Sequence, residues 1–170
     1  PALNEAPTLY RILPILRDAM NSITDSWEVL VIDGDSQDGT PAVVAQAGEP
    51  FRYICETERG YGRAFLRGVS EARGAYVLTM DADMSHPAEF VKALWAAREK
   101  ADIVIASRYV PGGLADQPAF RYYLSRVLNN FFGKGLAIPV KDMSSGFRLY
   151  RKRIFEGMDQ RFQFAINGDS

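Results

Sequence analysis

Four short apolar runs alternate with four stretches of helical pattern along the first two thirds of the chain. The runs are rich in Val, Ile, Leu and Tyr, which is typical of buried strands. They span residues 27–33, 51–55, 76–80 and 102–107. The helical stretches span residues 7–23, 40–47, 61–73 and 87–100. This alternation predicts an α/β fold in which helices flank a mostly parallel sheet.

Size and composition indicate one globular domain. The chain has 170 residues, 47% of them apolar and 24% charged, which excludes a collagenous, coiled-coil or wholly disordered protein. Cys55 is the only cysteine, so a disulfide framework within the chain and a cysteine-rich zinc site are excluded, and a reducing compartment is favoured. No apolar run approaches the roughly 18 residues of a membrane span. We expect a single cytoplasmic domain over residues 1–170.

The two parts of the chain differ in charge. Residues 1–107 carry 10 basic and 16 acidic groups, and residues 108–170 carry 10 and 5, so the net charges are −6 and +5. This asymmetry favours an acidic, cation-binding half beside a basic half that faces an anion. Uneven scatter of charges over a solvated surface explains it equally well.

Two carboxylates follow the third predicted strand, at the sheet edge where parallel α/β folds bind ligands. Alternation in an extended chain points Asp81 and Asp83 the same way. Their oxygens suit Mg²⁺ or Mn²⁺, with a bound diphosphate completing the coordination shell. A solvated loop is one alternative. In another alternative, one of the two carboxylates is the nucleophile of a phosphatase and the other is its partner acid.

The first predicted strand also ends in polar residues. Asp33 could accept hydrogen bonds from a base or ribose, or it could merely turn the chain together with Asp35 and Ser36. His86, the single histidine, could reach a metal or phosphate, but its place beside Pro87 is typical of a helix start.

Two features of the second half point to an anion and to a lipid. The turn over residues 144–148 could place Arg148 or backbone N–H groups against an anion, or it could be a plain loop. Residues 120–138 predict an amphipathic helix that faces either a lipid surface or the protein core.

In order and spacing, the motifs resemble glycosyltransferase family two, most closely its polyprenol-phosphate mannosyltransferase branch. The resemblance covers about residues 1–155. The segments that carry it are Pro1-Ala-Leu-Asn-Glu5, Val31-Ile-Asp-Gly-Asp-Ser-Gln-Asp-Gly-Thr40, Gly60-Tyr-Gly-Arg-Ala64 with Gly68 and Ala72-Arg-Gly74, Met80-Asp-Ala-Asp-Met-Ser-His-Pro87, Ser107-Arg-Tyr-Val-Pro-Gly-Gly113 and Ser144-Ser-Gly-Phe-Arg-Leu-Tyr150.

The resemblance implies the GT-A fold, with one further strand that would precede Pro1 and so come before the four strands predicted above. It implies an inverting, Mg²⁺- or Mn²⁺-dependent transfer of a hexose, with mannose favoured, from a nucleotide-diphosphate sugar to a polyprenyl phosphate. It further implies peripheral contact with the cytoplasmic membrane face and no nucleic-acid partner.

The resemblance also assigns site residues by position. Asp81 and Asp83 would hold the metal and, with Arg108, carry catalysis. Arg108, Arg121 and Ser125 would clamp the acceptor phosphate, and we group Arg148 with them. The residues expected to bind the donor are Pro1, Leu3, Glu5 and Asp33.

Departures from the family pattern leave alternatives open. The family usually reads Asp-Asp-Gly/Asn-Ser where this chain has Asp33-Gly-Asp-Ser36, so Asp35 could substitute in nucleoside recognition. A related enzyme could glycosylate a sugar hydroxyl, with Asp142 or Asp169 as the general base. A non-catalytic nucleotide-binding protein is a further alternative.

Overall fold

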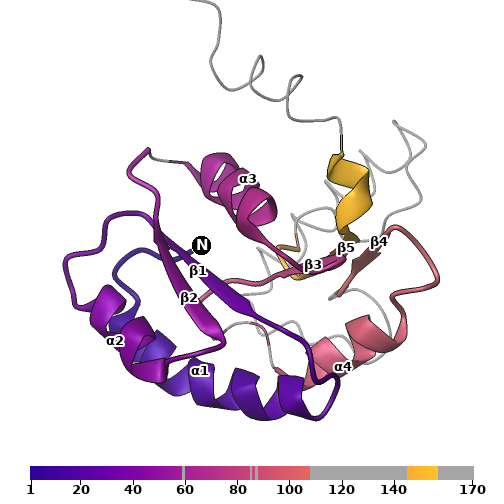
Figure 1. Ribbon diagram of the computed structural model, residues 1–170, viewed down its shortest axis with the longest axis horizontal. Helices are drawn as coiled ribbons and strands as arrows, with labels where there is room; N and C mark the ends of the chain where they lie inside the picture. The colour runs from indigo at the N-terminus through magenta and orange to yellow at the C-terminus, as the bar shows by residue number, and fades with distance from the viewer. Residues whose placement is uncertain (59, 85, 87, 108–144, 157–170) are drawn as a thin grey trace, which may run out of the picture.

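Helices and strands alternate as the sequence predicts (Figure 1). The computed structural model describes residues 1–58, 60–84, 86, 88–107 and 145–156. No helix within these residues is both long and apolar enough to span a membrane. The elements are α1 (Ala6–Asn21), β1 (Val29–Asp33), α2 (Thr40–Ala47), β2 (Phe51–Cys55), α3 (Tyr61–Glu71), β3 (Tyr76–Thr79), α4 (Glu89–Ala96), β4 (Ile103–Ile105), β5 (Arg148–Arg151) and the 3₁₀ helix η1 (Lys152–Phe155).

The strands form two small sheets. β1 and β2 pair in parallel, with Val29 opposite Phe51. In the other sheet, β5 lies between β3 and β4 and runs antiparallel to both. The predicted α/β class is therefore confirmed, while β5 is an addition. Its four residues begin and end with arginine, so they show none of the apolar pattern that marks the other strands.

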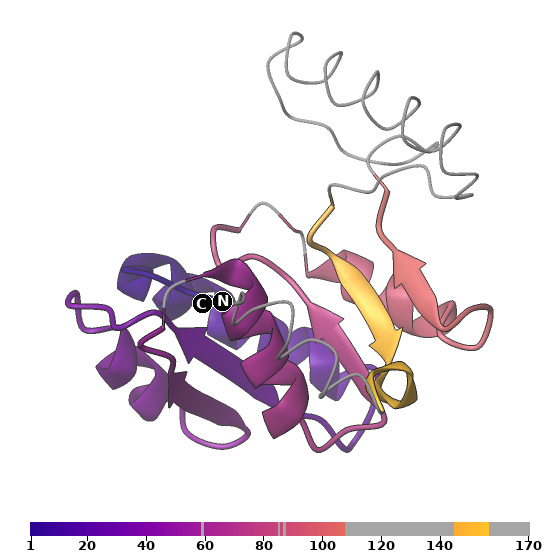
Figure 2. The same cartoon turned by 90° about the horizontal axis from the view of Figure 1, so that it is seen from above.

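Helices cover both faces of the strands (Figures 1 and 2). α1 and α4 lie on one side, and α3 lies on the other. Two apolar clusters form the core. Leu13, Val31 and Val44 belong to the cluster among α1, α2 and the β1–β2 pair, and Leu94 and Leu149 belong to the cluster under α4. Each sheet thus has its own buried face, and partly buried Met80 packs against both clusters.

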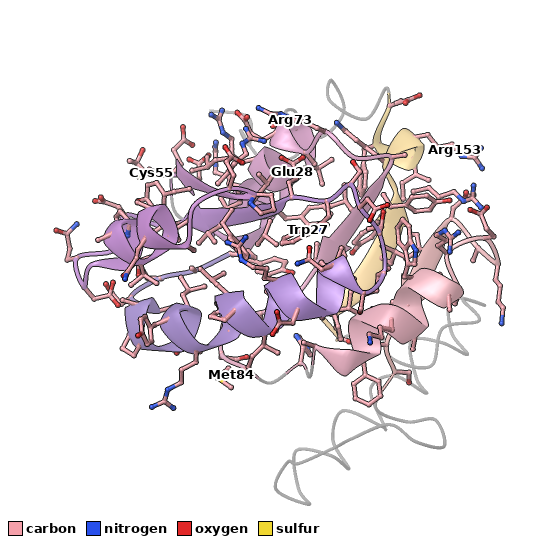
Figure 3. All side chains as sticks on the ribbon, turned by 60° about the horizontal axis from the view of Figure 1, so that its bottom comes forward. Trp27, Glu28, Cys55, Arg73, Met84 and Arg153 are labelled. Carbon is pink, nitrogen blue, oxygen red and sulfur yellow. The ribbon has the colours of Figure 1, made fainter. Side chains whose placement is uncertain are left out.

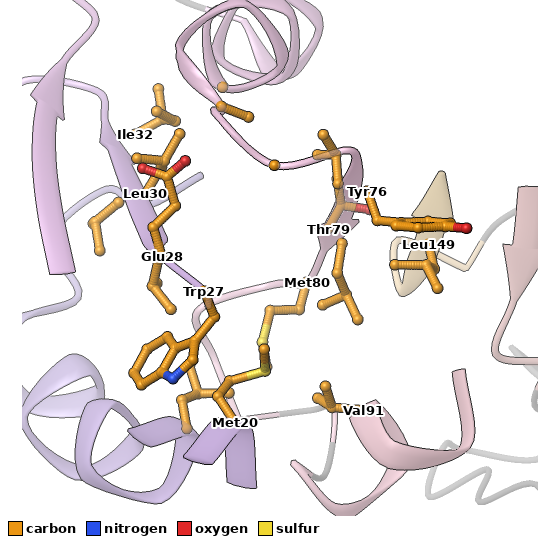
Figure 4. A pocket seen from close by; sticks show the side chains of 18 of the residues that line it. Met20, Trp27, Glu28, Leu30, Ile32, Tyr76, Thr79, Met80, Val91 and Leu149 are labelled. Atoms are coloured by element: carbon orange, nitrogen blue, oxygen red, sulfur yellow. The ribbon is translucent and has the colours of Figure 1, made fainter. Parts of the chain in front are cut away.

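A cavity of about 490 Å³ separates β1 from β3 (Figure 4). Its lining is mainly apolar and includes Leu30 and Val77. At one end, Ala2 forms a parallel bridge with β1: its N–H donates to Ile32 O (2.8 Å), and its carbonyl accepts from Gly34 N–H (2.9 Å). This geometry agrees with a strand that precedes Pro1, which remains a prediction.

An ionic cluster holds the end of α3 against the β1–β2 sheet. Glu28 accepts hydrogen bonds from the Arg73 N–H (2.6 Å) and Arg52 Nη1 (2.7 Å), and Arg52 also donates to the carbonyl of Glu71 (3.3 Å). Figure 3 shows Glu28 and Arg73 close together. Burial by itself would raise the pKa of Glu28, but the hydrogen bonds and charges of Arg73 and Arg52 together hold it below its usual value.

Candidate functional site

The strand ends that were predicted to form a site border one cavity. Ile32 in β1 and Asp81 after β3 line it together with Pro1, and so do Val29 and Tyr76 at the starts of the two strands. The loops that follow β1 and β3 are where an α/β fold is expected to bind its ligand.

Asp33 is fully buried and organises the loop that follows β1. Its side chain is 0% exposed and accepts hydrogen bonds from Ser36 N–H (2.9 Å), from the Ser36 hydroxyl and from the Tyr53 hydroxyl (2.9 Å). Burial, followed by the hydrogen bond to Asp33 and its charge, raises the pKa of Tyr53. The predicted donor-binding role of Asp33 stays a prediction, but the carboxylate itself is enclosed by internal donors.

The loop around residues 34–38 is also tied to the start of the chain. Asn4 N–H donates to Ser36 Oγ (2.7 Å), and Asn4 Oδ1 accepts from Gln37 N–H (3.0 Å). Asn4 and Asp35 both have left-handed backbone conformations, with φ of 56° and 67°. Such φ values are uncommon outside glycine and occur mostly in tight turns, so the chain turns sharply at both residues. Asp35 is exposed.

Asp38 joins the starts of two helices to this loop. It accepts hydrogen bonds from the Thr40 hydroxyl (2.7 Å) and Thr40 N–H (3.1 Å) at α2, and from Ala6 N–H (2.9 Å) at α1. These bonds, the one from the Thr40 hydroxyl first, hold the pKa of Asp38 below its usual value. One first-turn N–H group of each helix is thereby satisfied by the same carboxylate.

The remaining donor-binding candidates differ in exposure. Leu3 is 59% exposed, while Pro1 and Glu5 are half-buried. All three flank the Ala2 bridge and so lie next to the loop after β1. Pro1, Leu3 and Glu5 therefore belong to the segment that is tied to the Asp33 loop, and their role at the donor stays a prediction.

Asp81 lies in a second cavity, of about 460 Å³, at the end of β3. The cavity combines a carboxylate, a guanidinium group and several aromatic rings. Its lining residues are Tyr61, Phe65, Asp81, Ser145, Gly146, Arg148 and Tyr150. Burial, and then the charge of Asp81, raises the pKa of Tyr61, which keeps this phenol protonated beside the carboxylate.

His86 supports the loop after β3. Its Nδ1 accepts a hydrogen bond from the Asp81 N–H (3.2 Å), and its ring stacks on Phe147 at 4.8 Å between centroids. Nδ1 also lies 4.0 Å from Asp81 Oδ2. The structure thus places His86 against Asp81 and against the loop that leads into β5, where it orients the acidic turn.

The carboxylate pair fits a divalent cation in its donor chemistry. Asp81 is half-buried in a cavity, whereas Asp83 is exposed two residues further on and does not line it. β3 ends at Thr79 and the chain bends at residues 82–84, so the extended alternation expected to point both carboxylates the same way does not continue here. Within the residues that the structure describes, no group of three or more His, Cys, Asp or Glu side chains gathers in metal-binding geometry. A cation held here would complete its shell with water and with oxygens of a bound phosphate.

Arg148, predicted to face an anion, does lie in the Asp81 cavity. Its Nε donates to the carbonyl of Ser145 (2.7 Å), which fixes the guanidinium group near the start of β5. Several other candidates lie outside the described residues: Arg108, Arg121, Ser125, Asp142 and Asp169.

One residue of this region, Tyr53, was not singled out from the sequence, and two others, Tyr61 and Gly146, were noted only as members of short glycine-containing motifs. Tyr53 reaches Asp33 from the neighbouring strand, Tyr61 stands in the Asp81 cavity, and Gly146 closes against Asp81. The position of Tyr61 between two glycines at a helix start is a usable signal for a residue near a ligand. Nothing in the sequence pairs Tyr53 with Asp33, because that contact depends on the β1–β2 register.

Comparison with known proteins identifies the family. The chain is 33% identical to the dolichol-phosphate mannosyltransferase of Pyrococcus furiosus, over 94% of this chain and 47% of that protein. It is 34% identical to the polyprenol monophosphomannose synthase of Mycolicibacterium smegmatis, over 94% of this chain and 62% of that protein. The chain therefore spans about half to three fifths of these relatives.

Solved structures show the same fold. The mannosyl-3-phosphoglycerate synthase of Rubrobacter xylanophilus superposes with a TM-score of 0.73 at 24% identity, covering 91% of this chain and 53% of that one. A mannosyltransferase of Pyrobaculum calidifontis, solved with GDP-Man and Mn²⁺, has a TM-score of 0.55 at 24% identity, covering 92% and 44%. The profile of Glycosyl transferase family 2 matches residues 1–158, and the chain belongs to this family.

Proposed function

We propose that the full protein is an inverting, divalent-metal-dependent glycosyltransferase that moves a hexose, with mannose favoured, from a nucleotide-diphosphate sugar to a polyprenyl phosphate. The observation that carries the proposal is the placement of Asp81 with Arg148 in one polar and aromatic cavity at the end of β3. Similarity to a dolichol-phosphate mannosyltransferase and to a polyprenol monophosphomannose synthase supports the choice of sugar and acceptor.

The donor end of the site lies at the loop after β1. The exposed faces of Leu3 and Asp35 and the half-buried Pro1 are available to a nucleoside there. Asp33 holds that surface in shape through its bonds to Ser36 and Tyr53. A rigid loop lowers the entropy cost of binding the nucleoside.

Asp81 and Asp83 are the residues that would hold the cation with the donor diphosphate. When bound, a divalent cation neutralises the charge that develops on the departing nucleotide diphosphate. Arg148, whose Nε is held by the Ser145 carbonyl, lines the same cavity as Asp81, and in this proposal its positive charge serves the acceptor phosphate.

The acceptor needs positioning more than activation. A phosphate monoester has a second pKa near roughly 6, so it is largely ionised at neutral pH and requires no protein base. By resemblance, Arg108, Arg121 and Ser125 would hold it in line with the anomeric carbon, which raises the rate by orientation. Their positive charge would suit the net +5 of residues 108–170.

The site of action follows from the acceptor. A polyprenyl phosphate resides in a bilayer, so we place the protein peripherally at the cytoplasmic membrane face. Sedimentation of the full-length protein with anionic vesicles tests this part: the protein should pellet with vesicles that contain polyprenyl phosphate and stay in the supernatant without lipid.

An acceptor and donor screen tests the reaction. The full-length protein is incubated with GDP-mannose or UDP-glucose and Mn²⁺, with either a polyprenyl phosphate or a free sugar as acceptor, and EDTA serves as the metal control. We expect transfer to the lipid phosphate that EDTA abolishes. Transfer to a sugar hydroxyl with none to the lipid phosphate would contradict the acceptor, and tight donor binding without any turnover would favour a non-catalytic protein.

A single variant separates the acceptor clamp from the donor site. Arg121→Ala should lower turnover with polyprenyl phosphate by about 10-fold or more while donor affinity stays near the wild-type value. Arg121→Lys is the matched control, because it keeps the charge but loses bidentate geometry. An equal loss of donor affinity in Arg121→Ala would place this residue at the donor instead.

A further inference from the structure

The loop that leads into β5 presses its backbone against the carboxylate of Asp81. A Cβ atom built on Gly146 would lie 3.2 Å from Oδ2 and 3.3 Å from Oδ1 of Asp81, and 3.5 Å from its Cγ. Real side chains rarely approach so closely, so any other residue at this position would push against both carboxylate oxygens. The absence of a side chain at Gly146 is what admits Asp81 in its present place.

The need for glycine here does not come from the backbone. Gly146 does not adopt the left-handed conformation of Gly39 or Gly60, whose φ angles are 89° and 135°. An alanine at position 146 is therefore compatible with the backbone and would reduce the conformational entropy of the unfolded chain. The three nearest heavy atoms that the added methyl group would meet all belong to the Asp81 carboxylate.

The loop itself is held from two sides and cannot easily retreat. Thr79 Oγ1 donates to the carbonyl of Gly146 (2.8 Å), and Ser145 Oγ donates to the carbonyl of Ala106 (2.9 Å). Next to it, Phe147 is 2% exposed, and its carbonyl accepts from the Ala106 N–H (3.0 Å). Both neighbouring chain segments thus fix the Gly146 backbone.

Asp81 can retreat. Its side chain is 43% exposed and borders the cavity of about 460 Å³, so it is not enclosed on every side. A methyl group at position 146 would therefore be accommodated by a shift of the carboxylate of a few tenths of an ångström. Ligand sites lose affinity when their groups leave the productive position by about 0.5 Å.

We propose that Gly146 is a positioning residue, whose missing side chain sets the place of the Asp81 carboxylate for the cation and the donor diphosphate. This inference rests on the proposed function, because it assumes that Asp81 serves that ligand. It assigns to the β5 loop a role in donor binding that is separate from the charge of Arg148.

Calorimetric titration of the full-length protein with GDP-mannose and with UDP-glucose, each with and without Mn²⁺, tests the proposal. Gly146→Ala should weaken the Mn²⁺-dependent affinity by about 10-fold, a typical effect of displacing a metal ligand through its neighbour. Its melting temperature should stay within about 3 °C of wild type or rise. Gly68→Ala is the matched control, since its methyl group meets hydrocarbon, the Ile32 side chain, at 3.4 Å.

A double-mutant cycle shows whether the effect passes through Asp81. In the Asp81→Ala background, Gly146→Ala should cause no further loss of affinity. Wild-type affinity in Gly146→Ala, an equal loss in both backgrounds, or a large fall in its melting temperature would each overturn the positioning role. If the wild type itself shows no Mn²⁺-dependent binding of either donor, the proposed function fails, and the role of Gly146 fails with it.

Discussion

The hydroxyl of Tyr53 donates a hydrogen bond of 2.9 Å to the carboxylate of Asp33, and that carboxylate is completely shielded from solvent. The two residues sit on neighbouring parallel strands, with Asp33 at the very end of β1. Since Asp33 also accepts both hydrogen bonds of Ser36, this pair connects the sheet to the loop that faces the nucleoside in our proposal.

Tyr53→Phe should lower the free energy of unfolding by about 2 kcal/mol, because it removes a hydrogen bond to a buried charged group. Urea denaturation at pH 7 measures this change, with an unchanged m-value as the sign of an unaltered fold. Tyr10→Phe, at a residue that is 66% exposed, is the control and should have little effect.

The same pair predicts an alkaline loss of stability. The pKa of Tyr53 is raised above its usual value of 10 in the folded protein, chiefly by burial and then by Asp33. Above about pH 10 the unfolded chain releases this proton while the folded protein keeps it, so the free energy of unfolding falls as pH rises. Tyr53→Phe should show a shallower fall over that range, and parallel curves for the two proteins would contradict the raised pKa.

Asp33 and Asp35 should respond differently to the same change. Asp33→Asn places an NH₂ group where donors from Ser36 and Tyr53 converge, so it should cost about 1–3 kcal/mol of stability. Asp35→Asn lies on the surface and should leave the melting temperature unchanged while weakening donor affinity. Thermal melts and donor titration distinguish them, and an Asp33→Asn protein as stable as wild type would refute the structural role.

Asp83→Asn should weaken the Mn²⁺-dependent part of donor binding, because it removes one of two carboxylate ligands. Titration of a nucleotide sugar with and without Mn²⁺ measures this Mn²⁺-dependent part of the donor affinity. The metal-independent affinity serves as the internal control and should barely change. Unaltered Mn²⁺ dependence in this variant would remove Asp83 from the cation site.

Glu28 should contribute to stability in a pH-dependent way. Because its pKa is held below the usual 4.5, this contribution is present above about pH 4.5 and is lost as pH falls through the lower folded-state value. Glu28→Gln should flatten the acid limb of the stability curve, and Glu49→Gln, an exposed position, should not. Identical acid limbs in wild type and Glu28→Gln would argue against the Arg52–Glu28 anchor.

The cavity between β1 and β3 predicts that an added strand stabilises the fold. A protein that continues upstream of Pro1, in line with the Ala2 bridge, should melt at a higher temperature than residues 1–170 alone, because unpaired edges and apolar side chains become covered. Replacing two apolar upstream residues with Asp should cancel the gain. Equal melting temperatures with and without the upstream segment would show that no strand occupies this cavity.

Much of the fold and part of the site could be predicted from the sequence. The β-branched runs and the helical periodicity located four strands and four helices within a few residues, because these patterns reflect local burial. Asp81 and Asp83 could be singled out because they follow a buried strand, where α/β folds bind ligands, and their role at a cation stays a prediction. β5 could not be predicted, because a four-residue strand flanked by arginines carries no periodic signal.

The sequence by itself determined which segments become strands and helices, and that acidic residues follow two of the strands, since both depend on near neighbours in the chain. Only the tertiary structure decided which side chains and loops meet those acids. The register of β1 and β2 places Tyr53 against the buried Asp33. The strand β5 lies antiparallel beside β3 and brings Gly146 and Arg148 to Asp81, although more than sixty residues of the chain separate them. Such contacts depend on long-range packing, in which the distance along the chain places almost no limit on which side chains meet.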